Sequence, residues 1–241
     1  LPTVNGEKCV IRILATGDVG VRKITDLGMT PYNYDRFSRL IKVPQGVMLV
    51  TGPTGSGKTT TLYAALGELA KPNVNVITVE DPVEKNIEGI NQCQVNAKAG
   101  MTFAAALRSI LRQDPDIVMV GEMRDQETAE IAIRAAITGH MVLSTLHTND
   151  AASTITRLVD MGVAPYMVAT SLIGIVAQRL CKVVCNECKT PRMSTPEENE
   201  LLGITESATI YDACGCPKCN NTGYTGRTAT VSYTHLRAHE T

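Results

Sequence analysis

The sequence predicts an α/β fold, with a mostly parallel sheet covered by helices on both faces and a small cysteine-rich unit beside it. Strand-like and helix-like segments alternate over roughly 130 residues, and this order builds parallel strands joined by helical crossovers. Six of the eight cysteines fall in the last quarter of the 241 residues, in two clusters. Such clusters indicate a local structural unit rather than a disulfide framework for the whole chain.

Composition narrows the classes of function. With 44% hydrophobic and 20% charged residues, the chain is typical of a globular protein. A formal net charge of −1, two Phe and no Trp argue against a nucleic-acid partner, which would need basic surface and stacking aromatics. The longest apolar candidate for a membrane span, Met167–Ala177, falls short of the about 18 residues required. No signal peptide opens the chain, and a start at Leu1 without Met suggests a piece of a longer protein.

The expected strands are apolar runs rich in Val and Ile that end at a polar turn. They are Val10–Leu14, Val47–Thr51, Asn73–Val79, Ile117–Val120 and Met141–Thr145. The expected helices open at a capping residue, or at Lys58, and close near Gly or Pro. They are Thr30–Lys42, Lys58–Ala70, Thr102–Gln113, Asp125–Gly139 and Asp150–Met161. Because parallel strands end at one edge of a sheet, the residues that follow them should meet there.

A glycine-rich loop lies between the second expected strand and the helix that opens at Lys58. Gly52 and Gly57 bracket four residues before Lys58 and Thr59, which is the spacing of a phosphate-binding loop. Glycines let successive backbone N–H groups converge on phosphate oxygens, and the helix start adds partial positive charge. Lys58 would contact the β- and γ-phosphates, and the Thr59 hydroxyl would be a ligand of Mg²⁺. The predicted ATP-binding set is Gly52, Thr54, Gly55, Ser56, Gly57, Lys58, Thr59 and Thr60.

Carboxylates and a histidine follow three of the other strands. An ATP hydrolase needs a carboxylate that holds Mg²⁺, usually through water, and a group that orients the attacking water. We assign Glu122 to the metal and Glu84 to the water, while Asp81 supports the loop. His147 would contact the γ-phosphate or signal its loss, and Lys58 completes the predicted catalytic set. The alternative for Glu84 is a solvated loop carboxylate.

Other polar residues favour a less specific interpretation. Arg108 and Arg112 lie one helical turn apart, where they would contact phosphate, a neighbouring subunit or only solvent. His140 follows a glycine that ends a helix, which favours a structural role.

Two Cys-x-x-Cys pairs, Cys185/Cys188 and Cys216/Cys219, are separated by 27 residues. Four thiolates presented in this way complete a closed tetrahedral zinc shell with no position for substrate, so the predicted site is structural. A reducing, cytosolic location, which the nucleotide site implies, also favours metal over disulfides. The four remaining cysteines are Cys9, Cys93, Cys181 and Cys214. Each of them would be a small buried hydrophobic residue. Cys181 and Cys214 lie near the pairs, so either could replace one of the four predicted zinc ligands.

Four motifs in order resemble the cytoplasmic ATPases that drive type II secretion and type IV pilus extension. They are Gly52–Tyr63 as the Walker A loop, Ile77–Glu84 as the aspartate box, Asp116–Glu122 as Walker B and Gly139–Asn149 as the histidine box. The resemblance covers Leu1 to about Ala229. The paired cysteines and the following residues resemble the zinc module of the extension and secretion branch, which retraction motors lack.

The resemblance implies a RecA-like core that works as a hexameric ring. ATP turnover would move subunits against an inner-membrane platform protein that assembles pilins or pseudopilins, at the cytoplasmic face of the bacterial inner membrane. It also implies that Glu84 is the catalytic glutamate, Glu122 the Walker B acid and His147 the phosphate-sensing histidine. ATP, Mg²⁺ and Zn²⁺ are the expected ligands, and no nucleic-acid partner is expected.

The resemblance also divides the chain. Residues 1–25 would be the remnant of an upstream domain and linker, with Arg12 on a strand that matches the family but whose role stays open. Residues 26–178 would form the ATPase core and 179–229 the zinc unit. Residues 230–241 fit nothing in the family and resemble read-through into sequencing-adapter DNA, so His235 and His239 are excluded as metal ligands.

Two other functions remain open from the residues alone. A RecA-like core also suits a nucleic-acid translocase, although the neutral charge and few aromatics oppose this. A nucleotide-dependent zinc scaffold that binds ATP but barely hydrolyses it would show the same motifs.

Overall fold

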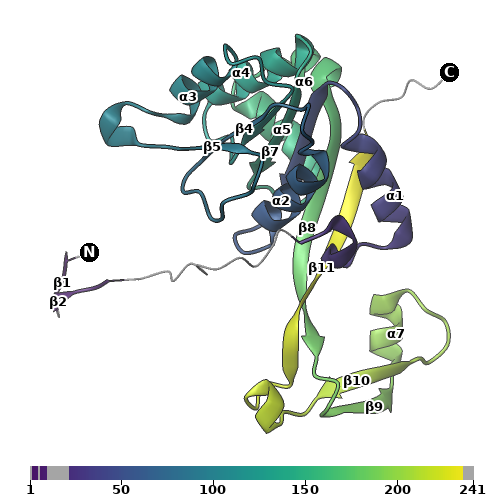
Figure 1. Ribbon diagram of the computed structural model, residues 1–241. Helices are drawn as coiled ribbons and strands as arrows, with labels where there is room; N and C mark the ends of the chain where they lie inside the picture. The colour runs from purple at the N-terminus through teal and green to yellow at the C-terminus, as the bar shows by residue number, and fades with distance from the viewer. Residues whose placement is uncertain (1, 5, 10–21, 236–241) are drawn as a thin grey trace.

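A seven-stranded sheet forms the centre of the computed structural model, which describes residues 2–4, 6–9 and 22–235 (Figure 1). Its strand order is β11-β8-β3-β7-β6-β4-β5. The strands are β3 (Gly46–Thr51), β4 (Val76–Glu80), β5 (Asn91–Gln94), β6 (Ile117–Val120), β7 (Met141–Leu146), β8 (Leu172–Val184) and β11 (Tyr224–His235). All neighbouring pairs are parallel except β11 with β8. The predicted mostly parallel α/β fold is therefore confirmed.

Helices cover both faces of this sheet. One face carries α3 (Phe103–Ile110), α4 (Gln126–Ile137), α5 (Ala151–Asp160) and α6 (Pro165–Ser171), and the other carries η1 (Ile24–Leu27), α1 (Pro31–Leu40) and α2 (Lys58–Leu69). Successive residues of β3 alternate between the two cores, with Leu49 in the first and Met48 in the second. A strand buried on both faces explains why this segment is a continuous apolar run.

The expected helix starts are confirmed by their caps. The side chains of four residues accept a hydrogen bond from the backbone N–H three residues later: Thr30, Thr102, Asp125 and Asp150. Helix ends differ from expectation by up to three residues, since the last turns close earlier. The expected strand Val10–Leu14 lies outside the described residues.

The apolar run Met167–Ala177 divides between two elements. Its first residues belong to α6, and β8 then begins at Leu172 and enters the sheet beside β3. None of the described helices is long and apolar enough to cross a bilayer.

The two strands at one end of the sheet continue beyond it as a ribbon. β8 is buried as far as Gln178 and is more exposed after it. The strand continues across the border between residues 178 and 179 that the sequence predicts for the core. Figure 1 shows β8 and β11 leading away from the sheet to a small unit. That unit contains β9 (Lys189–Met193), α7 (Pro196–Leu202), β10 (Thr209–Ala213) and η3 (Pro217–Cys219).

Three short elements lie elsewhere. β1 (Pro2–Thr3) pairs with β2 (Gly6–Glu7), and η2 (Ala97–Ala99) follows β5. β11 extends to His235, inside the segment predicted to be non-native, and the origin of that segment stays a prediction.

Candidate nucleotide site and candidate zinc centre

The glycine-rich loop leaves β3 at the centre of the sheet and curls into α2. Gly52 has φ 147°, and a Cβ there would lie 2.3 Å from the carbonyl oxygen of Gln178. Gly57, with φ 87°, is the N-cap of α2 and provides no side chain to cap the helix. The first N–H groups of α2 therefore remain available to an anion.

Lys58 lies beneath this loop. Its Nζ donates to the carbonyl oxygens of Gly52 at 2.9 Å and Pro53 at 3.1 Å, and the residue is only 8% exposed. Burial lowers the pKa of Lys58, and the negative charge of Glu122 acts in the opposite direction. An ammonium group has three donors, so one remains for a phosphate oxygen.

The other predicted ATP-binding residues line the same loop. Thr54, Gly55 and Thr60 are exposed, Thr59 is half-buried, and Ser56 is buried. The Ser56 Oγ has no hydrogen-bond partner, which is unusual for a buried hydroxyl. A loop with free N–H groups, an orphaned hydroxyl and a partly satisfied ammonium fits a bound polyphosphate.

Glu122 lies at the end of β6, beside His147 at the end of β7. The Oε2 atom of Glu122 is 3.5 Å from the Nε2 of His147, and the Oε1 accepts a 2.6 Å hydrogen bond from Arg124. This hydrogen bond raises the pKa of Arg124, which also lies 3.9 Å from a carboxylate oxygen of Asp81. Three adjacent strands, β4, β6 and β7, thus bring charged groups together at their carboxyl ends.

Thr51 ties the phosphate loop to the histidine segment. Its hydroxyl donates to the carbonyl oxygen of Leu146 at 3.1 Å and accepts from the backbone N–H of Thr148 at 3.1 Å. His147 lies between these two residues, so its backbone position is fixed relative to the last residue of β3.

Glu84 is held at its backbone rather than at its carboxylate. Its N–H donates to the hydroxyl of Tyr63 at 3.2 Å, and its side chain is exposed. In the described part of the chain, no hydrogen bond or ion pair engages the Glu84 carboxylate. Glu122 contacts His147 and its charge acts on Lys58, whereas no such interaction among the described residues connects Glu84 to them, and the role of Glu84 stays a prediction.

Oxygen ligands suited to Mg²⁺ are available at this edge. Thr59 offers a hydroxyl in the first turn of α2, and Glu122 offers a carboxylate that is 17% exposed. Hydroxyl and carboxylate oxygens are the ligands that Mg²⁺ prefers, together with water and phosphate. The residues present thus fit the predicted metal.

Gln178 is a supporting residue that the sequence did not reveal. Its amide nitrogen donates to the carbonyl oxygen of Ser56 at 2.7 Å, and its amide oxygen accepts from the Thr61 hydroxyl at 2.7 Å. It is 3% exposed. Its only signal in the sequence is a polar residue at the end of an apolar run, and its role emerges only when β8 is placed beside β3.

A cavity of about 250 Å³ adjoins the first turn of α2. Its lining includes Thr60, Leu180 and Gln178, with the guanidinium-bearing Arg22 and Arg227. The cavity thus combines apolar surface with cationic groups directly beside the phosphate loop.

Two of the three polar residues with less specific expectations, Arg108 and His140, have structural contacts. Arg108 pairs with Glu127 across the surface of α3 and α4. The Nδ1 of His140 lies 2.9 Å from the carbonyl oxygen of Ala135 at the end of α4. Both contacts join neighbouring elements and lie outside the group around Lys58.

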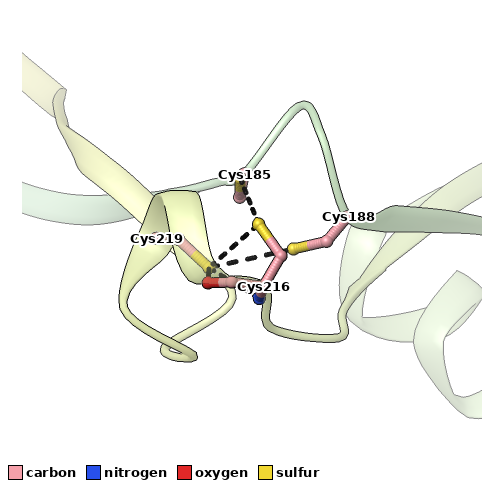
Figure 2. A group of neighbouring side chains, drawn as sticks. All are labelled: Cys185, Cys188, Cys216 and Cys219. Atoms are coloured by element: carbon pink, nitrogen blue, oxygen red, sulfur yellow. Dashed lines mark hydrogen bonds between the residues drawn. The ribbon is translucent and has the colours of Figure 1, made fainter.

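Four cysteines form a cluster at the tip of the ribbon. Figure 2 shows Cys185, Cys188, Cys216 and Cys219 turned toward a common point, and their sulfurs all lie within 4.8 Å of one another. Three sulfur pairs are 3.7 to 3.9 Å apart. Tetrahedral zinc with Zn–S bonds of about 2.3 Å holds its sulfurs about 3.8 Å apart, so the cluster fits zinc.

Backbone groups prepare one of these sulfurs for a negative charge. Burial opposes the thiolate of Cys219, but the N–H groups of Cys216 at 3.1 Å and Gly223 at 3.2 Å point at the sulfur. The net effect lowers the pKa of Cys219 to about 6. A thiolate is the form that binds metal.

The other two cysteines of this region stay outside the cluster. Cys181 is exposed on β8, and the sulfur of Cys214 lies 3.1 Å from the hydroxyl of Thr190. No disulfide joins any of the eight cysteines, all of which lie in the described residues.

Comparison with known proteins gives a consistent result. A family model described as "Type II/IV secretion system protein" matches residues 1–240. The chain is 53% identical to the "Type II secretion system ATPase E" of Vibrio cholerae over 230 residues, which is 95% of this chain and 46% of that protein. It is 52% identical to the "Type IV pilus assembly ATPase PilB" of Thermus thermophilus over 233 residues, or 95% of this chain and 26% of that protein. The chain thus spans half or less of the length of these relatives.

Solved structures with the same core are also found. The "Pilus Retraction Motor PilT" with bound ADP superposes with a TM-score of 0.65 at 39% identity, covering 73% of this chain and 52% of that one. The Legionella pneumophila ATPase DotB superposes with a TM-score of 0.63 at 25% identity, covering 90% of this chain and 51% of that one. These similarities confirm the predicted RecA-like core.

Proposed function

The chain belongs to the type II/IV secretion system protein family, and we propose that it is the ATP-hydrolysing part of a motor that drives type IV pilus extension or type II secretion. The observation that carries this proposal is the surroundings of Lys58. Its buried ammonium lies under a phosphate-type loop, and Glu122 and His147 come from two adjacent strand ends. A polyphosphate held by the loop would meet these groups.

Each residue has a distinct task in this proposal. The N–H groups at the start of α2 and the third donor of Lys58 would bind the β- and γ-phosphates. Thr59 and Glu122 would hold Mg²⁺, which when bound supplies neutralisation of the phosphate charge. Glu84 would orient the attacking water, and His147 would follow the presence of the γ-phosphate.

Arg124 must be accounted for in this scheme. It donates to the Glu122 oxygen that a metal or its water would also use. Arg124 is 60% exposed and therefore has room to withdraw from this carboxylate. Its partner Asp81 would keep it near the site after that movement, since the two already lie 3.9 Å apart.

The cavity beside α2 supports the choice of a nucleotide over free polyphosphate. It opens next to Gly57 and Thr60 at the phosphate loop, and its 250 Å³ offer apolar and cationic surface to a nucleoside. We propose that the base and ribose lie there. The solved retraction motor of the same fold is described with bound ADP.

The wider assembly is proposed from the family. We propose a cytoplasmic homo-hexamer at the inner face of the bacterial inner membrane, which transmits its movement to a platform protein. The four-cysteine unit would bind zinc as a structural site, because its sulfurs leave no position for substrate.

Replacement of Lys58 tests the function. In the active assembly, Lys58→Ala should lower ATP turnover by about 10²-fold or more, the cost of losing a preorganised charge at the phosphates. The fold should be retained, as circular dichroism and thermal unfolding would report. Lys71→Ala is the matched control, because Lys71 is an exposed lysine just after the same helix. Near-normal turnover in Lys58→Ala would refute the proposal.

A further inference from the structure

We propose that Tyr63 and Glu80 are positioning residues, which connect the phosphate-binding helix to the loop that carries Glu84. This inference rests on the proposed function, because it takes Glu84 as the residue that orients water. Tyr63 lies in α2, five residues after Lys58, and Glu80 is the last residue of β4. Their side-chain hydrogen bonds, as far as the structure describes the chain, go to residues outside the phosphate loop, so we assign neither a direct role on ATP.

The hydroxyl of Tyr63 accepts hydrogen bonds from the loop. The N–H of Glu84 donates to it at 3.2 Å, and the N–H of Lys85 also donates to it. Tyr63 is 5% exposed, so little of its side chain is open to water. One oxygen atom of α2 thereby fixes the two consecutive peptide groups on either side of the Glu84 side chain.

The proton of the same hydroxyl goes to Glu80. Tyr63 donates to one Glu80 carboxylate oxygen, while Thr78 at 2.6 Å and Gln92 at 3.0 Å donate to the other. Glu80 is 3% exposed, and three donors satisfy it. Burial, with the hydrogen bond and charge of Glu80, raises the pKa of Tyr63, so the hydroxyl keeps its proton.

This arrangement gives the hydroxyl a single orientation. A tyrosine oxygen has one proton and two acceptor positions. Because Glu80 takes the proton, both acceptor positions face Glu84 and Lys85. An amide at position 80 would place an NH₂ group against at least one donor, and reversal of the Tyr63 hydroxyl would release a loop N–H.

The far side of the loop is held by β5. The side chain of Gln92 donates to the carbonyl oxygen of Lys85 at 3.0 Å and accepts from the N–H of Ile87 at 2.7 Å. Gln94 accepts from the N–H of Val83 at 3.2 Å. These contacts hold the loop against β5, and the hydrogen bond to Tyr63 holds it against α2. A nucleotide bound at Lys58 and a water oriented by Glu84 would therefore share one rigid frame.

The consequence is a separation between binding and hydrolysis. Loss of the Tyr63 hydroxyl leaves Lys58 and the helix start unchanged, so ATP affinity should persist. The loss of this hydroxyl does release the loop around Glu84, and displacement of a catalytic group by about 1 Å can cost about 10²-fold in rate. A residue with a merely structural role would instead change affinity, rate and thermal stability together.

The test combines Tyr63→Phe with Glu84→Gln in a double-mutant cycle on the active assembly. ATP turnover, affinity for a non-hydrolysable ATP analogue and thermal unfolding are measured for each variant. Tyr63→Phe should lower kcat about 10- to 100-fold. The same substitution should change the affinity for the analogue by less than about twofold. Added to Glu84→Gln, it should change the remaining rate by less than about twofold, because a residue that acts only through Glu84 has no further effect once that carboxylate is lost. Glu80→Gln should behave like Tyr63→Phe, while Tyr166→Phe, at an exposed tyrosine, is the matched control.

Several results would overturn the inference. Wild-type kcat in Tyr63→Phe would do so, as would an equal loss of rate in the presence and absence of the Glu84 carboxylate. Analogue affinity that falls in step with kcat would also do so. Wild-type turnover in Glu84→Gln would remove the role of Glu84 and this inference with it. Near-normal turnover in Lys58→Ala would instead contradict the proposed function, so the two failures are distinguishable.

Discussion

The sheet core and the four-cysteine unit lie at the two ends of the β8–β11 ribbon, and they are stabilised by different interactions. In the core, strands such as β3 are buried along their whole length, and Leu49 and Leu143 are 0% exposed. In the unit, α7 has no buried residue, and the only buried hydrophobic side chains between residues 185 and 223 are Cys185 and Cys219.

Ion pairs do not replace the missing core of the small unit. Arg192 bonds to Glu198 and Asp212, but all three side chains are more than 30% exposed. Pairs that face solvent contribute little to stability. Units of this size with so few buried apolar groups usually need a metal, disulfides or a partner subunit to fold. Hydrophobic burial therefore stabilises the core, whereas we expect the small unit to depend on a metal bound by its four sulfurs.

Removal of zinc should therefore produce the largest difference in stability between the two regions. Structural zinc contributes about 10 kcal/mol or more to the folding of a small domain. Chelation, or Cys185→Ser, should unfold the unit while the core retains its protection. Elemental analysis of purified protein and hydrogen exchange of residues 185–223 would measure both effects.

Cys181→Ser serves as the control for the zinc experiment, because Cys181 is exposed and outside the cluster. It should retain full zinc content. If zinc were absent and Cys185→Ser folded normally, the proposed dependence of the unit on metal would be wrong. If chelation unfolded the core together with the unit, the division between the two regions would fail.

A smaller effect is expected from a deletion in the core. Leu49→Ala removes most of a fully buried side chain of β3, on the face covered by α3 to α6, and such changes cost about 2–5 kcal/mol. The cost arises from lost apolar burial and from the cavity that remains. The free energy of unfolding from denaturant titration of the core would report it.

The smallest effect is expected from the matching substitution in the unit. Leu201, on α7, is 87% exposed, so Leu201→Ala should change stability by less than about 0.5 kcal/mol. Hydrogen exchange of α7 with zinc bound would measure it. A loss comparable to that of Leu49→Ala would mean that α7 is covered in solution and that the comparison of the two regions is incomplete.

Much of the core could be predicted from the sequence because its signals are local. The capping side chains of Thr30, Thr102 and Asp125 mark helix starts, and apolar runs mark buried strands. The strand β8 could not be predicted in the same way. Only Thr170 and Ser171 separate its apolar residues from those of α6, and an apolar run alone does not distinguish helix from strand.

The site was predictable to the extent that it follows strand ends. Glu122 and His147 meet because β6 and β7 are adjacent, and the spacing of Gly52, Gly57 and Lys58 marks the loop itself. Gln178 and Tyr63 were not predictable as site residues. Their contacts depend on which strand or loop the fold places against α2, more than fifteen residues away in the chain.

The proposed function depends most on one arrangement: a triphosphate on the loop at Lys58, with carboxylates and a histidine from separate strand ends around it. A structure determined with a non-hydrolysable ATP analogue and Mg²⁺ would test it directly. We expect the terminal phosphates at Lys58 and the start of α2, the metal between Thr59 and Glu122, and Glu84 facing the terminal phosphate. A triphosphate bound elsewhere, or Glu122 and His147 far from it, would contradict the proposed function.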